Sequence, residues 1–93
     1  MANSIKVTNV QVFPFKESPA IGRIRGIAMV EINGAICVRG LRIMRGDEGL
    51  FVGYPVDPFY KGEEYRYVVE CITEEAKKAI ETAVLDKYRE LAD

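Results

Sequence analysis

The fold is decided by residues 23 to 55, which read RIRGIAMVEINGAICVRGLRIMRGDEGLFVGYP. Two runs rich in β-branched residues flank Asn33 and Gly34, a pair typical of a tight hairpin because both central residues of a type I′ turn need a positive φ. A short glycine-bounded turn then leads into an apolar run that Pro55 ends, since proline cannot donate to a central ladder. The sequence therefore predicts a β-meander with strands at about 23–32, 35–45 and 50–54.

A two-residue turn would place Ile32 opposite Ala35, and this register divides the hairpin into two faces. One of these faces is apolar near the turn and basic at its far end, where Arg25 is expected opposite Arg42. Like charges that face each other across a ladder are destabilising, so this pair favours an anionic ligand. The opposite face of the hairpin is nearly all apolar, and its one charged residue, Arg39, either lies at an edge or pairs across a subunit boundary. Its members are Ile24, Gly26, Ala28, Val30, Ile32, Ala35, Cys37, Arg39, Leu41 and Ile43.

Three more elements flank this meander. A first strand over about 5–13 changes the parity of its apolar positions between Val7 and Val10, which predicts a bulge near Thr8. Residues 64–71 are predicted as a fifth strand, and Phe59 is expected to hold the preceding loop against the core. From about 74 to 91 the apolar residues recur at helical spacing, with Thr73 in front of them as an N-cap.

Together these elements predict one α+β domain over residues 1–93, an antiparallel β-meander sheet of four to five strands covered by a C-terminal amphipathic helix. The helix is expected on the near-apolar face. Only one helix is predicted, so the apolar end of the other face would be exposed in a monomer, and such patches usually mark interfaces. We therefore predict a homodimer through the sheet. Its interface residues would be Ile27, Met29, Ile36 and Val38.

Composition narrows the possible functions. The 93 residues include no histidine, and the two cysteines, Cys37 and Cys71, have no metal-like or redox-like spacing. The usual general base and the commonest metal ligand are therefore missing, so we predict no enzyme activity, catalytic residue, metal, cofactor or small-molecule substrate. The apolar stretches are too short to span a bilayer, and the N-terminus lacks a secretory pattern. We expect a cytoplasmic protein without membrane contact.

Charge is divided unevenly along the chain. Up to residue 46 there are seven basic and two acidic residues, and after it there are six basic and twelve acidic residues. This division indicates a basic sheet and an acidic helical end. Three readings are compatible with it: an anionic ligand, head-to-tail self-association, or a surface that is merely kept soluble.

Residues 38–55, VRGLRIMRGDEGLFVGYP, resemble the signature of the SpoVG septation-regulator family, in which a strand leads through a glycine-containing turn to Gly-Leu-Phe-Val and then to a proline. Residues 7–10 and 84–91 are also similar to that family's ends. The resemblance implies a small bacterial α+β protein that is dimeric through its sheet, binds nucleic acid and regulates gene expression, in some bacteria in sporulation or septation. In the family a basic stretch commonly follows the proline. Here that stretch is replaced by residues 56–61, of which Lys61 is the only basic one.

Two functions follow as hypotheses. The first is a nucleic-acid-binding regulator that contacts phosphates, which supply affinity and salt dependence without specifying sequence. The alternative is a protein–protein interaction module without nucleic-acid binding. The choice between DNA and RNA is left open. The predicted phosphate contacts are Arg23, Arg25, Arg42, Lys61 and Arg66.

Overall fold

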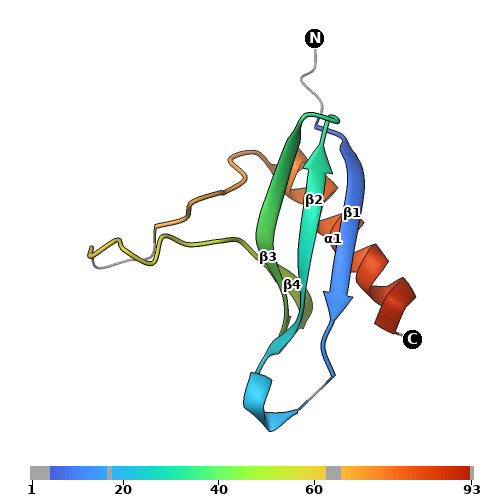
Figure 1. Ribbon diagram of the computed structural model, residues 1–93, viewed down its shortest axis with the longest axis vertical. Coiled ribbons are helices and arrows are strands. Elements are labelled where there is room, and N and C mark those ends of the chain that lie inside the picture. Colours follow the sequence, from blue (N-terminus) through green and yellow to red (C-terminus); the bar gives the residue numbers. More distant parts are fainter. Residues whose placement is uncertain (1–4, 17, 63–65, 93) are drawn as a thin grey trace.

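The computed structural model describes residues 5–16, 18–62 and 66–92, and it has the predicted α+β architecture. Four antiparallel strands form one sheet in the order β1-β2-β3-β4, and a single helix crosses one of its faces (Figure 1). The three-strand meander of β2, β3 and β4 is therefore confirmed. The elements are β1 (Val7–Pro14), the short 3-10 helix η1 (Pro19–Ile21), β2 (Ile24–Ile32), β3 (Ile36–Gly46), β4 (Gly49–Gly53) and α1 (Glu74–Ala92).

The hairpin between β2 and β3 turns at the predicted dipeptide. Asn33 and Gly34 have φ values of 54° and 62°, and the amide of Ala35 donates to the carbonyl of Ile32 at 3.0 Å. The predicted register is wrong, however, because Ala35 remains in the turn and Ile32 pairs with Ile36.

A bulge in β3 changes the register a second time. Ala28 pairs with Leu41 and Val30 pairs with Val38, so β3 carries one residue more than β2 across this interval. The extra residue belongs to the pair Arg39-Gly40, where Gly40 has a φ of 83° that favours glycine. Val38 therefore lies on the same face as Leu41, and Arg39 leaves the face on which the sequence placed it.

A second bulge lies in β2 at Arg25. Ile24 pairs with Met44 while Gly26 pairs with Ile43, so Arg25 is the additional residue. The partner of Arg42 on β2 is then Ile27. The predicted opposition of Arg25 and Arg42 is wrong, because the longer turn and the bulge at Arg39-Gly40 each shift the partner of Arg42 by one residue, from Arg25 to Ile27.

The bulge predicted near Thr8 is present. The pairing of β1 with β2 shifts between Val7 and Asn9. The Thr8 hydroxyl accepts from the Gly34 amide at 2.9 Å and lies 2.8 Å from Oε2 of Glu31. Thr8, the extra residue of this bulge, thus connects β1 by a hydrogen bond to the turn between β2 and β3.

The helix begins as predicted, because Oγ1 of Thr73 accepts from the amide of Ala76 at 3.1 Å. Glu74 and Glu75 follow in the first turn, where the helix dipole favours negative charge. The helix packs on what we call the inner face of the sheet, and this contact forms the core. The buried members of the core cluster are Val12, Ala28, Val30, Val38, Leu41, Ile43, Val52, Ile80 and Val84.

The connection from β4 to α1 is an arm, residues 55–62 and 66–72, that projects from the sheet (yellow to orange in Figure 1). The predicted fifth strand is wrong over residues 66–71: they contribute an isolated bridge between Val56 and Tyr67, and the rest of that prediction lies outside the described residues. The Asp57 amide donates to the Arg66 carbonyl at 2.7 Å, which holds the two sides of the arm together. Phe59 is 84% exposed, so the prediction that it packs against the core is also wrong.

Candidate nucleic-acid interface

The face of the sheet opposite α1, which we call the outer face, carries cationic and aromatic side chains side by side. Strand pairing places Phe13 next to Ile27, Ile27 next to Arg42, and Arg42 next to Gly53 in one row across all four strands. These side chains alternate with buried neighbours such as Val12 and Val52, because successive side chains of a strand point to opposite faces. The residues of the outer face include Phe13, Ile27, Met29, Glu31, Arg39, Arg42, Met44, Phe51 and Gly53.

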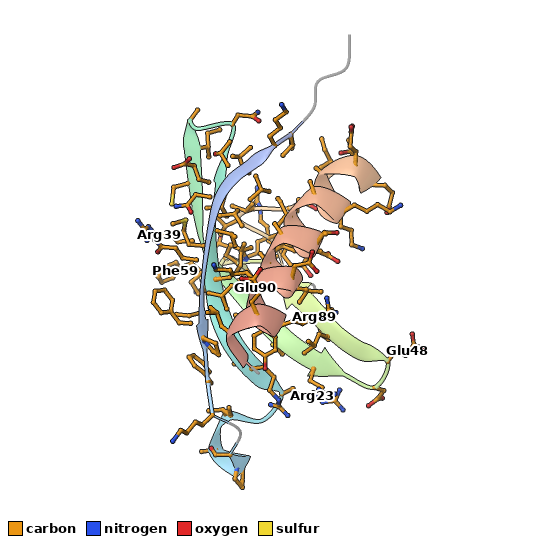
Figure 2. All side chains as sticks on the ribbon, turned by 90° about the vertical axis from the view of Figure 1, so that its right-hand side faces the viewer. Arg23, Arg39, Glu48, Phe59, Arg89 and Glu90 are labelled. Atoms are coloured by element: carbon orange, nitrogen blue, oxygen red, sulfur yellow. The ribbon has the colours of Figure 1, made fainter. Side chains whose placement is uncertain are left out.

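Two arginines of the outer face are available to an anion. Arg39 is exposed, and Figure 2 shows it on the side of the sheet away from α1. Arg42 is half-buried, and its guanidinium lies over Gly53, where a methyl group would come within 3.5 Å of Nη2. Within the part of the chain that the structure describes, neither arginine forms an ion pair. The acidic side chain that shares this face, Glu31, lies next to the Thr8 hydroxyl.

A hollow of about 250 Å³ opens where the arm leaves the sheet. We call it the arm hollow. Arg42 forms part of its wall together with the rings of Phe51 and Tyr67, which are 45% and 46% exposed. The hollow thus combines a cation with aromatic faces that solvent reaches. Its lining residues are Arg42, Met44, Phe51, Gly53, Tyr54, Val56 and Tyr67.

The arm itself carries two of the predicted phosphate contacts. The guanidinium carbon of Arg66 lies 5.5 Å from the centre of the Tyr60 ring, a cation–π arrangement. Lys61 is exposed beside them. These groups lie on the arm, which projects from the sheet (Figure 1), whereas Arg42 lies on β3 where the arm begins.

The other two predicted contacts lie elsewhere. Arg23 forms an exposed ion pair with Asp47 at 3.4 Å, and in Figure 2 it lies on the α1 side of the sheet, away from Arg39. The guanidinium of Arg25 donates to the carbonyl of Gly22 at 2.7 Å and to that of Ile24 at 3.3 Å, so it stabilises the loop before β2. The five predicted residues therefore do not form one surface.

The predicted dimer interface is divided as well. Ile27 is 43% exposed on the outer face, and Met29 is half-buried beside it. Val38 is a core residue, so its assignment to an interface is wrong. Ile36 has the same strand parity as Val38 and is exposed only because it lies at the turn end of the sheet. The register of the turn is the reason for this division, because Ile32 pairs with Ile36 and Val30 pairs with Val38 on the inner face.

The sequence model of the SpoVG family matches residues 5–90, which span every strand and most of α1. The chain belongs to the SpoVG family. Similar proteins include those of Phytoplasma australiense (28% identical, over 94% of this chain and 86% of the relative), Aster yellows witches'-broom phytoplasma (29%, 96% and 86%) and Fusobacterium nucleatum (30%, 90% and 88%). Each of these relatives carries the name SpoVG and an assignment to septation.

In this SpoVG chain the arm is fastened to α1 by Tyr54. Its hydroxyl lies 3.4 Å from Oε2 of Glu81 and accepts from Sγ of Cys71 at 3.5 Å. Burial raises the pKa of Tyr54 far above its ordinary value, and the neighbouring Cys71 and Glu81 raise this pKa further. The phenol therefore keeps its proton, and its contacts at the base of the arm, at alkaline pH values where an ordinary tyrosine ionises.

Sequence reasoning missed part of the outer face of this SpoVG domain. It assigned no function to Phe13 or Phe51, and it placed Arg39 on the wrong face. A signal for Arg39 was available, because a glycine inside a strand often marks a bulge, and Gly40 follows Arg39 directly. Within residues 5–16, 18–62 and 66–92, no three metal-ligating acids or cysteines gather at one point, and no helix has the length and apolar character that a membrane span needs.

Proposed function

We propose that this SpoVG-family protein is a regulator in septation or sporulation that acts by binding nucleic acid on its outer face. The observation that carries the proposal is that two exposed aromatic side chains, Phe13 and Phe51, share with Arg39 and Arg42 the face that α1 leaves uncovered. Arginine contacts to phosphate supply sequence-independent affinity, and aromatic side chains offer stacking platforms for bases. The proposal assigns no catalytic step to the protein.

The location of the charges supports this function better than the total charge does. The whole chain has a formal net charge of -1, so it has no general attraction to a polyanion. Arg39 and Arg42 lie on one face, whereas the ion pairs of α1, Lys87–Glu90 and Arg89–Asp86, belong to the element on the opposite side. A polyanion is therefore attracted to one side of the molecule.

Fluorescence anisotropy with labelled DNA and RNA of mixed sequence tests the proposal, at low and at physiological salt. Binding should weaken steeply as salt rises, and the double variant Arg39→Ala with Arg42→Ala should lose it. Arg89→Ala is the matched control, because it removes one exposed arginine from α1 and should leave binding intact. Absence of binding at low salt, or equal binding by the double variant, would refute the proposal.

A second candidate function is self-association through the same face. Phe13 is 57% exposed, Ile27 is 43% exposed and Phe51 is 45% exposed, and exposed apolar groups that cluster commonly mark interfaces. Light scattering after size exclusion would detect the homodimer, and Ile27→Glu should dissociate it. A second subunit and nucleic acid would compete for the face, so adding an oligonucleotide should lower the dimer fraction if both functions use it.

A further inference from the structure

We infer that the arm hollow receives a single unstacked base, so that the nucleic acid on the outer face is single-stranded; this inference rests on the proposed function and specifies its ligand. The hollow measures about 250 Å³. Sites for drug-sized ligands occupy roughly 300–1,000 Å³. The arm hollow therefore suits one planar ring system better than a larger ligand.

The lining of the hollow has the chemistry of a base site. Phe51 and Tyr67 line the hollow and are 45% and 46% exposed, and base–aromatic stacking tolerates every base because each has a π-face. The guanidinium of Arg42 is planar and permanently charged, so it can stack on a base or bind the adjoining phosphate. One wall of the hollow is therefore suited to the base and another to its phosphate.

Gly53 keeps the hollow open. A side chain at this position would begin 3.5 Å from Nη2 of Arg42 and 3.7 Å from Cγ of Met44. Glycine is otherwise unfavourable inside a strand, and Gly53 needs no positive φ, since the glycines with positive φ are Gly22, Gly34, Gly40 and Gly49. Space beside Arg42, and not backbone conformation, is what glycine contributes here.

The walls are held in position before a ligand arrives. The bridge between Val56 and Tyr67 and the 2.9 Å bond from the Val68 amide to the Pro55 carbonyl fix the root of the arm. Tyr54 adds its contacts to Cys71 and Glu81. Such prior ordering reduces the entropy that binding would otherwise cost.

Duplex nucleic acid does not fit this geometry. In a duplex the base faces are stacked on one another, and single strands are the form in which they are free to meet aromatic side chains. A duplex would contact the exposed Arg39 and the tip of the arm but would leave the hollow empty. The structure therefore predicts a preference for single strands that phosphate contacts alone cannot produce.

A tryptophan probe tests the inference directly, because the chain contains no tryptophan. In Phe51→Trp, the emission of the single tryptophan, excited selectively over the five tyrosines, should be quenched by oligothymidylate. It should not be quenched by an abasic oligomer of equal length, which carries the same phosphates without bases. Phe15→Trp is the control, since Phe15 is exposed beyond the end of β1 and its emission should not change.

The variant Gly53→Val supplies an independent readout by filling the hollow. Its affinity for oligothymidylate should fall about tenfold, a loss in the range of one stacked base, while its affinity for duplex of equal length should stay unchanged. Tyr67→Ala, on the exposed arm, should show the same pattern and keeps the test valid if Gly53→Val folds poorly by circular dichroism.

The outcomes separate the two proposals. If wild-type protein binds no nucleic acid of any form at low salt, the proposed function fails and the inference falls with it. If wild-type protein binds duplex and single strand equally, with no quenching of Phe51→Trp and no change in Gly53→Val, the proposed function stands and the base site is refuted. Quenching by the abasic oligomer would also refute the base site.

Discussion

The two faces of the sheet are formed by the same four strands and yet have opposite properties. On the inner face Val30, Leu41 and Ile43 are fully buried under α1. On the outer face Phe13 and Phe51 remain 57% and 45% exposed. Alternation along a strand supplies two faces, and the one helix packed on the sheet covers only one of them. The comparison indicates that the inner face stabilises the fold and leaves the outer face free to bind.

The strongest test of this division compares one substitution on each face. Leu41→Ala, on the inner face, should reduce the free energy of unfolding by about 2–5 kcal/mol, because it removes buried methyl groups and leaves a cavity. Ile27→Ala, on the outer face, should reduce it by less than about 1 kcal/mol. Urea denaturation measures both values. Equal losses would mean that the outer face is covered in solution.

The bulge that separates the faces can be tested at Gly40. A non-glycine residue at its φ of 83° is strained, so Gly40→Ala should lower the free energy of unfolding by about 1–2 kcal/mol. The nearest side-chain atom to an added methyl group is Cβ of Pro55 at 3.7 Å, an ordinary contact, so backbone strain is the sole cause. Gly40→Asn should lose less, because asparagine tolerates left-handed conformations. An undiminished stability in Gly40→Ala would contradict the bulge geometry.

The attachment of α1 to the inner face begins at Thr73. Thr73→Ala removes the acceptor for the Ala76 amide and should lower the free energy of unfolding by about 1 kcal/mol. Thr73→Ser keeps a hydroxyl and should retain most of the stability. Thermal unfolding followed by circular dichroism at the helix band compares the two. A loss of the same size in Thr73→Ser would show that the cap hydrogen bond is not the cause.

The smallest effect is expected at Tyr54, where the arm joins the α1 side of the molecule. The folded protein retains the phenol proton because its pKa is raised, whereas the unfolded chain releases it near the ordinary value of 10.0. The stability that the protonated phenol of Tyr54 contributes is thus fully present below about pH 10 and is lost as the pH rises further. Between about pH 8 and pH 11, wild type should lose more stability than Tyr54→Phe. Parallel pH profiles would contradict the raised pKa.

Features that depend on neighbouring residues in the chain could be predicted from the sequence. The Asn33-Gly34 turn, the bulge at Thr8 and the Thr73 cap each leave a local signature: a dipeptide with positive φ, a change of parity, or a hydroxyl before an amphipathic run. The α+β class follows from the same local patterns, as does the choice of β2 residues for the inner face.

The position of the site depended on strand register and on contacts between residues far apart in the sequence, and local sequence patterns determine neither. A shift of one residue moves every following side chain to the other face, so the longer turn and the unanticipated bulges at Arg25 and Arg39-Gly40 together changed the predicted positions of Arg39, Val38 and Arg25. The arm hollow likewise needs Arg42 from β3 and Tyr67 from the arm, residues that meet only after the chain has folded.

Residue chemistry alone was therefore enough to specify the four strands of the sheet, the C-terminal helix and their order, but it also predicted a fifth strand that the structure does not have over residues 66–71. Strand register and the path of the arm decided which arginines share a surface. Packing against α1 selects one strand register from several that local propensities would allow. For this SpoVG domain most of the core could be predicted from the sequence because burial alternates along the regular stretches of the strands, and Val38, beside the bulge in β3, was an exception. The candidate interface could not be predicted in this way, because the residues that form it do not recur at a regular spacing along the chain.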